Sequence, residues 1–120
     1  MTAPNAIPGE LVEEVRRRLA QARREIYATV ATTDEELATL EAHQPGSPPE
    51  DVVAETASAI LSRLEGREKH ELDEIDAAQA RLAAGTYGAC EGCRRPIPLE
   101  RLRAVPTARH CVACQRRQER

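Results

Sequence analysis

Apolar residues recur at steps of three and four along the first two-thirds of the chain, which predicts helices with one buried face each. The first stripe starts behind Pro8 and contains Leu11, Val15, Leu19, Ala22, Ile26, Val30, Thr33, Leu37 and Leu40. The second stripe runs up to Gly85, the expected stop of its helix, and contains Val53, Ala57, Ile60, Leu64, Leu72, Ile75 and Leu82.

The clearest break between the stripes is the segment His43-Gln44-Pro45-Gly46-Ser47-Pro48-Pro49. Pro-Gly favours a turn, while Ser47, Pro48 and Glu50 offer an N-cap, a first-turn proline and a capping-box acid for the second helix. Two helices of similar length on a short link are expected to fold back on each other. The pattern predicts an antiparallel coiled-coil hairpin over residues 8–84, with its turn at 44–49 and an arm of about 50 Å.

Three features of the sequence test this hairpin: a possible helix start near Thr33, a glycine within the second helix, and a charged pair that would set the register. Thr33 and Glu36 could form a capping box for a new helix, but the continuing stripe favours one helix that bends there. Gly66 is expected inside the second helix, at a cost of about 1 kcal/mol relative to alanine. Positions equally far from the turn place Glu68 near Arg23 or Arg24 as a register-setting pair, the alternative being a solvated Glu68.

Composition agrees with long, thinly packed helices. The 120 residues include no Trp, no Phe and two Tyr, and 31% of them are charged. Residues 1–84 hold 17 acidic and 9 basic side chains, whereas residues 85–120 hold 8 Arg and 3 Glu. An acidic arm repels phosphates, which argues against its binding nucleic acid. No run of eighteen apolar residues exists to span a membrane.

All four cysteines lie in two Cys-x-x-Cys pairs, Cys90/Cys93 and Cys111/Cys114. This spacing is typical of two knuckles that close on one zinc ion. Disulfides require an oxidising compartment, yet no export signal is recognised, so we expect a cytoplasmic protein. A thioredoxin-like dithiol would need one pair beside a βαβ unit, whereas here two pairs follow a helix.

Four thiolates fill the tetrahedron around zinc and leave no place for an activated water. The predicted metal is therefore one structural Zn²⁺, with His110 beside the site rather than a ligand. No Ser/His/Asp ordering, glycine-rich phosphate loop or open metal site is visible, so we do not expect an enzyme.

The finger region resembles the zinc-finger signature of the DksA/TraR family beyond its cysteines. The matching segments are Gly85-Thr86-Tyr87-Gly88-Ala89-Cys90-Glu91-Gly92-Cys93, Ile97-Pro98, Arg101-Leu102, Ala104-Val105-Pro106-Thr107 and Cys111-Val112-Ala113-Cys114. The resemblance implies a mainly α protein with the hairpin ahead of a finger at 85–114. Residues 1–7 are expected as a flexible N-terminus and 115–120 as a short basic tail.

The resemblance further implies a bacterial transcription regulator that binds RNA polymerase at its secondary channel, with the hairpin tip reaching the active centre. Glu50 and Asp51 are the candidate tip acids, although both also suit the start of a helix. The spacing of acids and alanine after Glu50 departs from the family's usual tip. Only six residues follow Cys114, so a response to the alarmone guanosine tetraphosphate is not implied.

The alternative is a zinc ribbon that binds nucleic acid or another protein through its arginines, without modulating a polymerase. Arg101 and Arg103, between the two knuckles, are the residues we expect to face a partner. Direct nucleic-acid binding is the weaker interpretation, because only Tyr87 offers a ring on which a base could stack.

Overall fold

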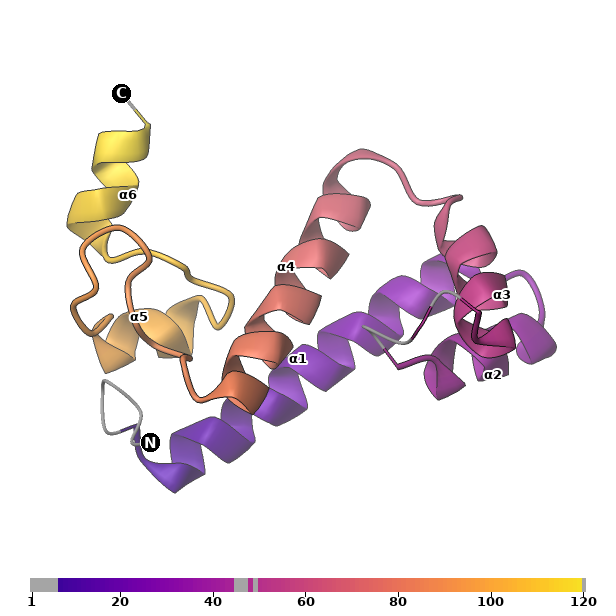
Figure 1. Ribbon diagram of the computed structural model, residues 1–120, viewed down its shortest axis with the longest axis horizontal. Coiled ribbons are helices and arrows are strands. Elements are labelled where there is room, and N and C mark those ends of the chain that lie inside the picture. Colours follow the sequence, from indigo (N-terminus) through magenta and orange to yellow (C-terminus); the bar gives the residue numbers. More distant parts are fainter. Residues whose placement is uncertain (1–6, 45–47, 49, 120) are drawn as a thin grey trace. The chain divides into compact units, whose positions relative to one another are not determined.

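The computed structural model describes residues 7–44, 48 and 50–119 of the chain (Figure 1). Its helices are α1 (Gly9–Val30), α2 (Asp34–Ala42), α3 (Val52–Leu61), α4 (Gly66–Ala84), α5 (Leu99–Ala104) and α6 (Val112–Gln118). The described residues form no strand, and a single antiparallel bridge pairs Ala89 with Pro96. The predicted fold class, a helical hairpin followed by a four-cysteine finger, is confirmed.

The chain divides into two compact units. One unit is Ala20–Asp76, called the acidic unit here because it holds 14 acidic and 5 basic side chains, a net charge of −9. The other, the finger unit, combines Met1–Leu19 with Ala77–Arg120 and holds 12 basic and 6 acidic side chains, a net charge of +6. Helices α1 and α4 contribute residues to both units.

In the acidic unit, α2 and α3 lie side by side, and the adjoining parts of α1 and α4 run antiparallel (Figure 1). Two contacts fix that direction: Arg23 pairs with Asp76 at 2.5 Å, and the Thr29 hydroxyl donates to Glu68 at 2.9 Å. Apolar side chains from all four helices and from the α3–α4 connection make the buried core, which comprises Ile26, Tyr27, Val30, Leu40, Ala57, Ile60, Leu64, Leu72 and Ile75.

The finger unit has its own core, built by the first half of α1, the end of α4, the loops of the finger and helices α5 and α6. Its buried members are Leu11, Val15, Leu19, Ala78, Tyr87, Cys90, Ile97, Leu102, Ala108 and Cys114. Most apolar positions of the two predicted stripes are therefore buried, as their spacing indicates. Val53 departs from this pattern, since it remains 37% exposed.

The prediction of one continuous first helix is wrong. Helix α1 ends at Val30, and α2 starts after Thr33, whose hydroxyl accepts a hydrogen bond from the backbone N–H of Glu36. The Glu36 carboxylate in turn accepts from the backbone N–H of Thr32 at 2.9 Å. Local capping thus outweighs the continuing apolar stripe, because side chains satisfy N–H groups that a fresh helix start leaves unpaired.

The second helix is also interrupted, at residues 62–65 between α3 and α4. Gly66 was expected inside a helix, but it is the first residue of α4 and has φ of +61°. A glycine is favoured there because the backbone is left-handed at this residue. Helix α3 begins at Val52 with Asp51 as its N-cap, which overturns the assignment of that role to Ser47. The predicted turn at Pro45-Gly46 lies outside the described residues.

The two interruptions are joined by one ion pair. The two terminal guanidinium nitrogens of Arg63, in the α3–α4 connection, donate to the carboxylate of Glu36, Nη1 at 2.8 Å and Nη2 at 2.7 Å. Hydrogen bonds from Arg63 and then from Thr32 lower the pKa of Glu36 to about 2. This carboxylate therefore ties the start of α2 to the end of α3.

The predicted register of the hairpin is wrong. Arg23 pairs with Asp76 and not with Glu68, which instead accepts from Thr29. The observed partner of Arg23 lies about two helical turns further along the chain than the predicted one. The prediction failed because it counted residues from the turn along two uninterrupted helices.

Among the described residues, no helix is long and apolar enough to cross a membrane.

Candidate metal centre

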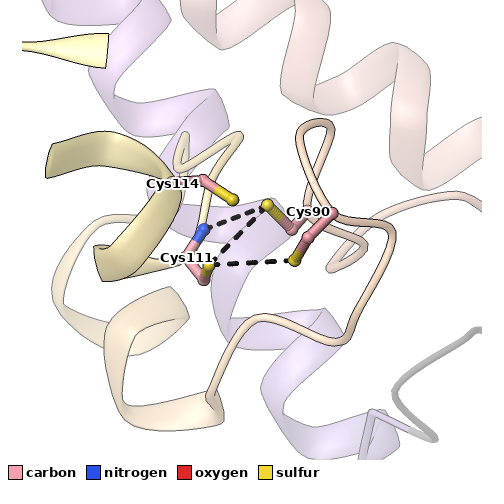
Figure 2. Close-up of side chains that lie close together, drawn as sticks. Cys90, Cys111 and Cys114 are labelled. Carbon is pink, nitrogen blue, oxygen red and sulfur yellow. Dashed lines mark hydrogen bonds between the residues drawn. The ribbon is translucent and has the colours of Figure 1, made fainter. Parts of the chain in front are cut away.

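The four cysteine sulfurs gather in one place although the two pairs are far apart in sequence. All four sulfur atoms lie within 4.8 Å of one another, and Figure 2 shows those of Cys90, Cys111 and Cys114 directed toward a common point. Cys111 Sγ lies 3.8 Å from Cys90 Sγ and 3.9 Å from Cys93 Sγ. A tetrahedral zinc with Zn–S bonds of about 2.3 Å separates its sulfurs by about 3.8 Å, so the set fits one zinc ion.

The first knuckle is a tight turn held by backbone hydrogen bonds. Arg94 N–H donates to the carbonyl of Cys90 at 2.9 Å, and Cys90 N–H donates to the carbonyl of Arg95 at 2.9 Å. Arg94 takes φ of +68°, the left-handed conformation that reverses the chain just after the second cysteine. This reversal brings Cys90 and Cys93 to the same side.

The second knuckle is the start of helix α6. Cys111 is its N-cap residue and Cys114 lies in its first turn, so the helical backbone sets the separation of these two sulfurs. The backbone N–H of Glu91 donates to the carbonyl of Arg109 at 2.8 Å, and that of Cys111 donates to Cys90 Sγ at 3.4 Å. These two bonds connect the knuckles and hold the segments side by side.

The sulfurs differ in their electrostatic surroundings. Burial would raise the pKa of the Cys90 thiol, but N–H groups of Cys111, Cys93 and Gly92 stabilise its thiolate and hold the pKa at about 6. Burial, followed by the neighbouring cysteines, raises the pKa of Cys114 to about 12, and Arg117 acts in the opposite direction. Zinc binds cysteines as thiolates, and the charge of the bound ion lowers the pKa of the thiols that coordinate it.

Gly92 is required by the closeness of the knuckles. A Cβ placed on Gly92 would lie 3.0 Å from Cys114 Sγ and 3.2 Å from Cys114 Cβ. The short pair therefore needs a residue without a side chain between its cysteines. The sequence places Gly92 within the family signature without giving it a role, although a glycine between two ligands is a usable signal. The contact of Arg117 with Cys114 was not predicted.

Other residues predicted in this region have definite places. His110 is outside the sulfur cluster, and its Nε2 lies 2.9 Å from Nε2 of Gln118. Tyr87 is 3% exposed and donates its hydroxyl to the carbonyl of Pro106 at 2.7 Å, which fastens the start of the finger to the segment before the second knuckle. Residues 115–118, expected as part of a tail, belong to α6.

The two arginines expected to face a partner differ in their contacts. Arg101 donates from Nε to the carbonyl of His110 at 2.8 Å and is half-buried, so it supports the second knuckle. The side chain of Arg103 is exposed, and its carbonyl accepts from Arg18. A partner-facing role therefore remains a prediction that suits Arg103 better.

The candidate tip acids lie in the acidic unit. Asp51 caps α3, its Oδ1 accepting from the backbone N–H of Val53 at 2.9 Å. Glu50 is exposed in the turn before this cap, and Val52 beside them is 74% exposed. Of the two carboxylates, that of Asp51 thus has a structural task.

The comparisons with known proteins agree with this site. The family model described as the prokaryotic dksA/traR C4-type zinc finger matches residues 85–120. The solved structure of transcription factor DksA2 from Pseudomonas aeruginosa is 36% identical, covers 92% of this chain and 84% of that chain, and superposes with a TM-score of 0.59.

Sequence relatives extend the same likeness. The RNA polymerase-binding transcription factor DksA of Caulobacter vibrioides is 42% identical over 67 residues, which are 56% of this chain and 47% of the relative. An uncharacterised 8.5 kDa protein of Escherichia phage 186 is 40% identical over 57 residues, covering 48% of this chain and 71% of the relative. The matches to the Caulobacter protein and to an uncharacterised Aquifex aeolicus protein span less than half of those relatives' lengths.

Three observations identify the family. The four sulfurs lie at zinc spacing, the finger matches the family model, and a solved structure is similar over nearly the whole chain. The chain belongs to the DksA/TraR family, and its four cysteines, Cys90, Cys93, Cys111 and Cys114, are positioned to hold the one zinc ion of a C4-type finger.

Proposed function

We propose that this protein is a bacterial transcription regulator that binds RNA polymerase. The observation that carries the proposal is the 36% identity to a solved transcription factor over 92% of the chain. The name of the Caulobacter relative states the partner, RNA polymerase, and the part of the chain that matches it supports the same partner here. The proposed site of action is the cytoplasm, where that enzyme works.

We propose further that the hairpin tip enters the secondary channel while the finger unit contacts the polymerase surface. The opposite net charges of the two units, −9 and +6, support different tasks for them. Mg²⁺ is commonly coordinated by carboxylate oxygens, so an acidic tip could interact with a magnesium-centred active site. Glu50 is the better candidate for this contact, because Asp51 already caps α3.

The zinc site supports a structural role and no chemistry of its own. Four thiolates occupy every position of a tetrahedral ion, which leaves none for substrate or water. The finger therefore holds a binding surface in shape, and Arg103 is the exposed residue that we assign to this surface.

The first experiment is retention of the full-length zinc protein by purified bacterial core RNA polymerase. We expect co-elution in gel filtration at physiological salt. The same protein is offered duplex DNA alone, where we expect no retention. Retention by DNA with a steep salt dependence, and none by polymerase, would replace the proposal with the nucleic-acid interpretation.

The second experiment separates the two roles of the tip. Asp51→Asn removes the charge but retains a good N-cap, whereas Asp51→Ala removes both. Glu50→Gln removes the exposed charge, and Glu55→Gln is the control on the next turn of α3. If the tip acts on the active centre, Glu50→Gln and Asp51→Asn change transcript yield from a responsive promoter while polymerase retention persists. Unchanged yield in both variants would refute the tip role and leave binding intact.

A further inference from the structure

The sulfur of Cys114 has a hydrogen-bond donor of a different kind from the donors of Cys90 and Cys111. Nη2 of Arg117 donates to Cys114 Sγ at 3.1 Å. The two residues are three positions apart on α6, a spacing that places side chains on the same face of a helix. Cys114 is 5% exposed, so the guanidinium approaches a sulfur that little water reaches.

Backbone amides donate to the first cysteine of each knuckle, Cys90 and Cys111. Cys90 Sγ accepts from the N–H of Cys111 at 3.4 Å and from the amides of Cys93 and Gly92. Cys111 accepts from the amide of Cys114. Backbone donors come with the fold and no point substitution of a side chain removes them, whereas the donor of Cys114 depends on the identity of residue 117.

The charge of the site makes this difference important. Zn²⁺ with four thiolates carries a net charge of −2, and buried charge is costly without a compensating partner. A hydrogen bond from a cation is about twice as strong as one between neutral groups. Groups that hydrogen-bond to metal ligands commonly change metal affinity by about 10- to 100-fold when they are removed.

We propose that Arg117 is a positioning residue of the zinc site, whose guanidinium holds the Cys114 sulfur against the metal and sets how slowly zinc leaves. The inference concerns the zinc site alone and is independent of any role in transcription. It makes Cys114 the ligand whose attachment responds most to a change outside the four cysteines.

The test is the rate of zinc transfer from the full-length protein to the chromogenic chelator 4-(2-pyridylazo)resorcinol. Arg117→Gln is compared with Arg116→Gln, which makes the same change in net charge at the neighbouring exposed position of α6. We expect transfer to be about 10-fold faster in Arg117→Gln and close to wild type in Arg116→Gln. Arg117→Lys keeps the positive charge and is expected to recover part of the difference.

A spectroscopic measurement separates this role from general loosening of α6. In protein loaded with Co²⁺, replacing the cationic donor to one sulfur by the shorter, neutral amide of glutamine weakens that hydrogen bond and so lowers the energy of the sulfur-to-cobalt charge-transfer band. We expect a shift to longer wavelength in Arg117→Gln and none in Arg116→Gln.

Equal transfer rates in these two variants would overturn the proposal, as would fast transfer with an unshifted cobalt band. If Arg117→Gln loses its zinc during purification, Arg117→Lys is compared with Arg116→Lys. Equal rates in that pair would overturn the proposal, and a faster rate in Arg117→Lys would support it.

Discussion

At the scale of single residues, the finger requires a glycine at position 92, where a side chain would contact Cys114. Gly92→Ala would place a Cβ 3.0 Å from Cys114 Sγ, and bonding to zinc would restrain that sulfur from moving aside. We expect the variant to bind zinc more weakly and to unfold at a lower temperature. Zinc content after dialysis and thermal unfolding measure both effects.

The matched control for that variant is Gly9→Ala, at the start of α1, where an added Cβ meets nothing within 4 Å. It should bind zinc like the wild type, with stability unchanged or slightly raised. Equal zinc retention in the two variants would show that the knuckles have room to separate.

Tyr87 gives a pH-dependent prediction at the same scale. Burial raises the pKa of Tyr87 to about 12, against the opposing effect of Arg81 and Arg18. The folded state therefore keeps the phenol proton more tightly than the unfolded chain, where tyrosine ionises near pH 10. This stabilisation is complete below about pH 10 and is lost as the pH rises toward 12.

Tyr87→Phe removes the hydrogen bond to the carbonyl of Pro106 and should lower the free energy of unfolding by about 1–3 kcal/mol at pH 8. The gap between wild type and variant should narrow between pH 10 and pH 12, as measured by urea unfolding of the zinc-loaded proteins. A gap that stays constant over this range would contradict the burial of a neutral, donating hydroxyl.

At the scale of elements, Gly66 distinguishes an interrupted helix from a continuous one. In a continuous helix, Gly66→Ala would stabilise the protein by about 1 kcal/mol. Gly66 instead has φ of +61° with open space around its Cβ position, so alanine is strained by its backbone alone. We expect destabilisation of about 1–2 kcal/mol.

Denaturant unfolding gives the sign of that change directly. Gly66→Asn serves as the companion variant, because asparagine tolerates the left-handed conformation better than alanine does. If Gly66→Ala stabilised the protein, the result would support the continuous helix predicted from the sequence and contradict the interruption between α3 and α4.

The elements also show what the sequence could predict. The apolar spacing identifies the buried faces, because burial follows the period of the helix whether or not the helix is interrupted. For the same reason it misses the breaks: Leu64 lies in the connection between α3 and α4, yet it is 7% exposed and fits the stripe. The register then fails, since it was counted along helices that are not continuous.

The metal site was predictable to a different extent. Cysteine spacing predicts the four ligands, because coordination chemistry restricts which thiols share an ion, and the structure brings these four sulfurs within 4.8 Å of one another. The contact of Arg117 with Cys114 could not be predicted from spacing alone, because it requires residues 115–118 to continue α6 beyond the second knuckle. Those residues read as a polar tail in the sequence.

At the scale of the whole molecule, the two units should depend on zinc to different degrees. The acidic unit, Ala20–Asp76, contains none of the four cysteines and has its own buried core. In the finger unit, Cys90 and Cys114 are themselves core residues, and few regular elements surround them. Apparent zinc-binding free energies of small zinc modules, about 10–16 kcal/mol, are largely folding free energy.

We therefore expect chelation of zinc to unfold the finger and leave the acidic unit helical. Hydrogen exchange read by mass spectrometry should show loss of protection in peptides from residues 85–114, where the Glu91–Arg109 and Cys90–Arg95 backbone bonds need closed knuckles. Peptides from residues 52–76 should keep most of their protection, because Ile60, Leu72 and Ile75 stay buried without the metal. Protection should return when zinc is added back. Equal loss in both regions would mean that the acidic unit's own core is insufficient, and that the metal stabilises the chain as a single cooperative structure.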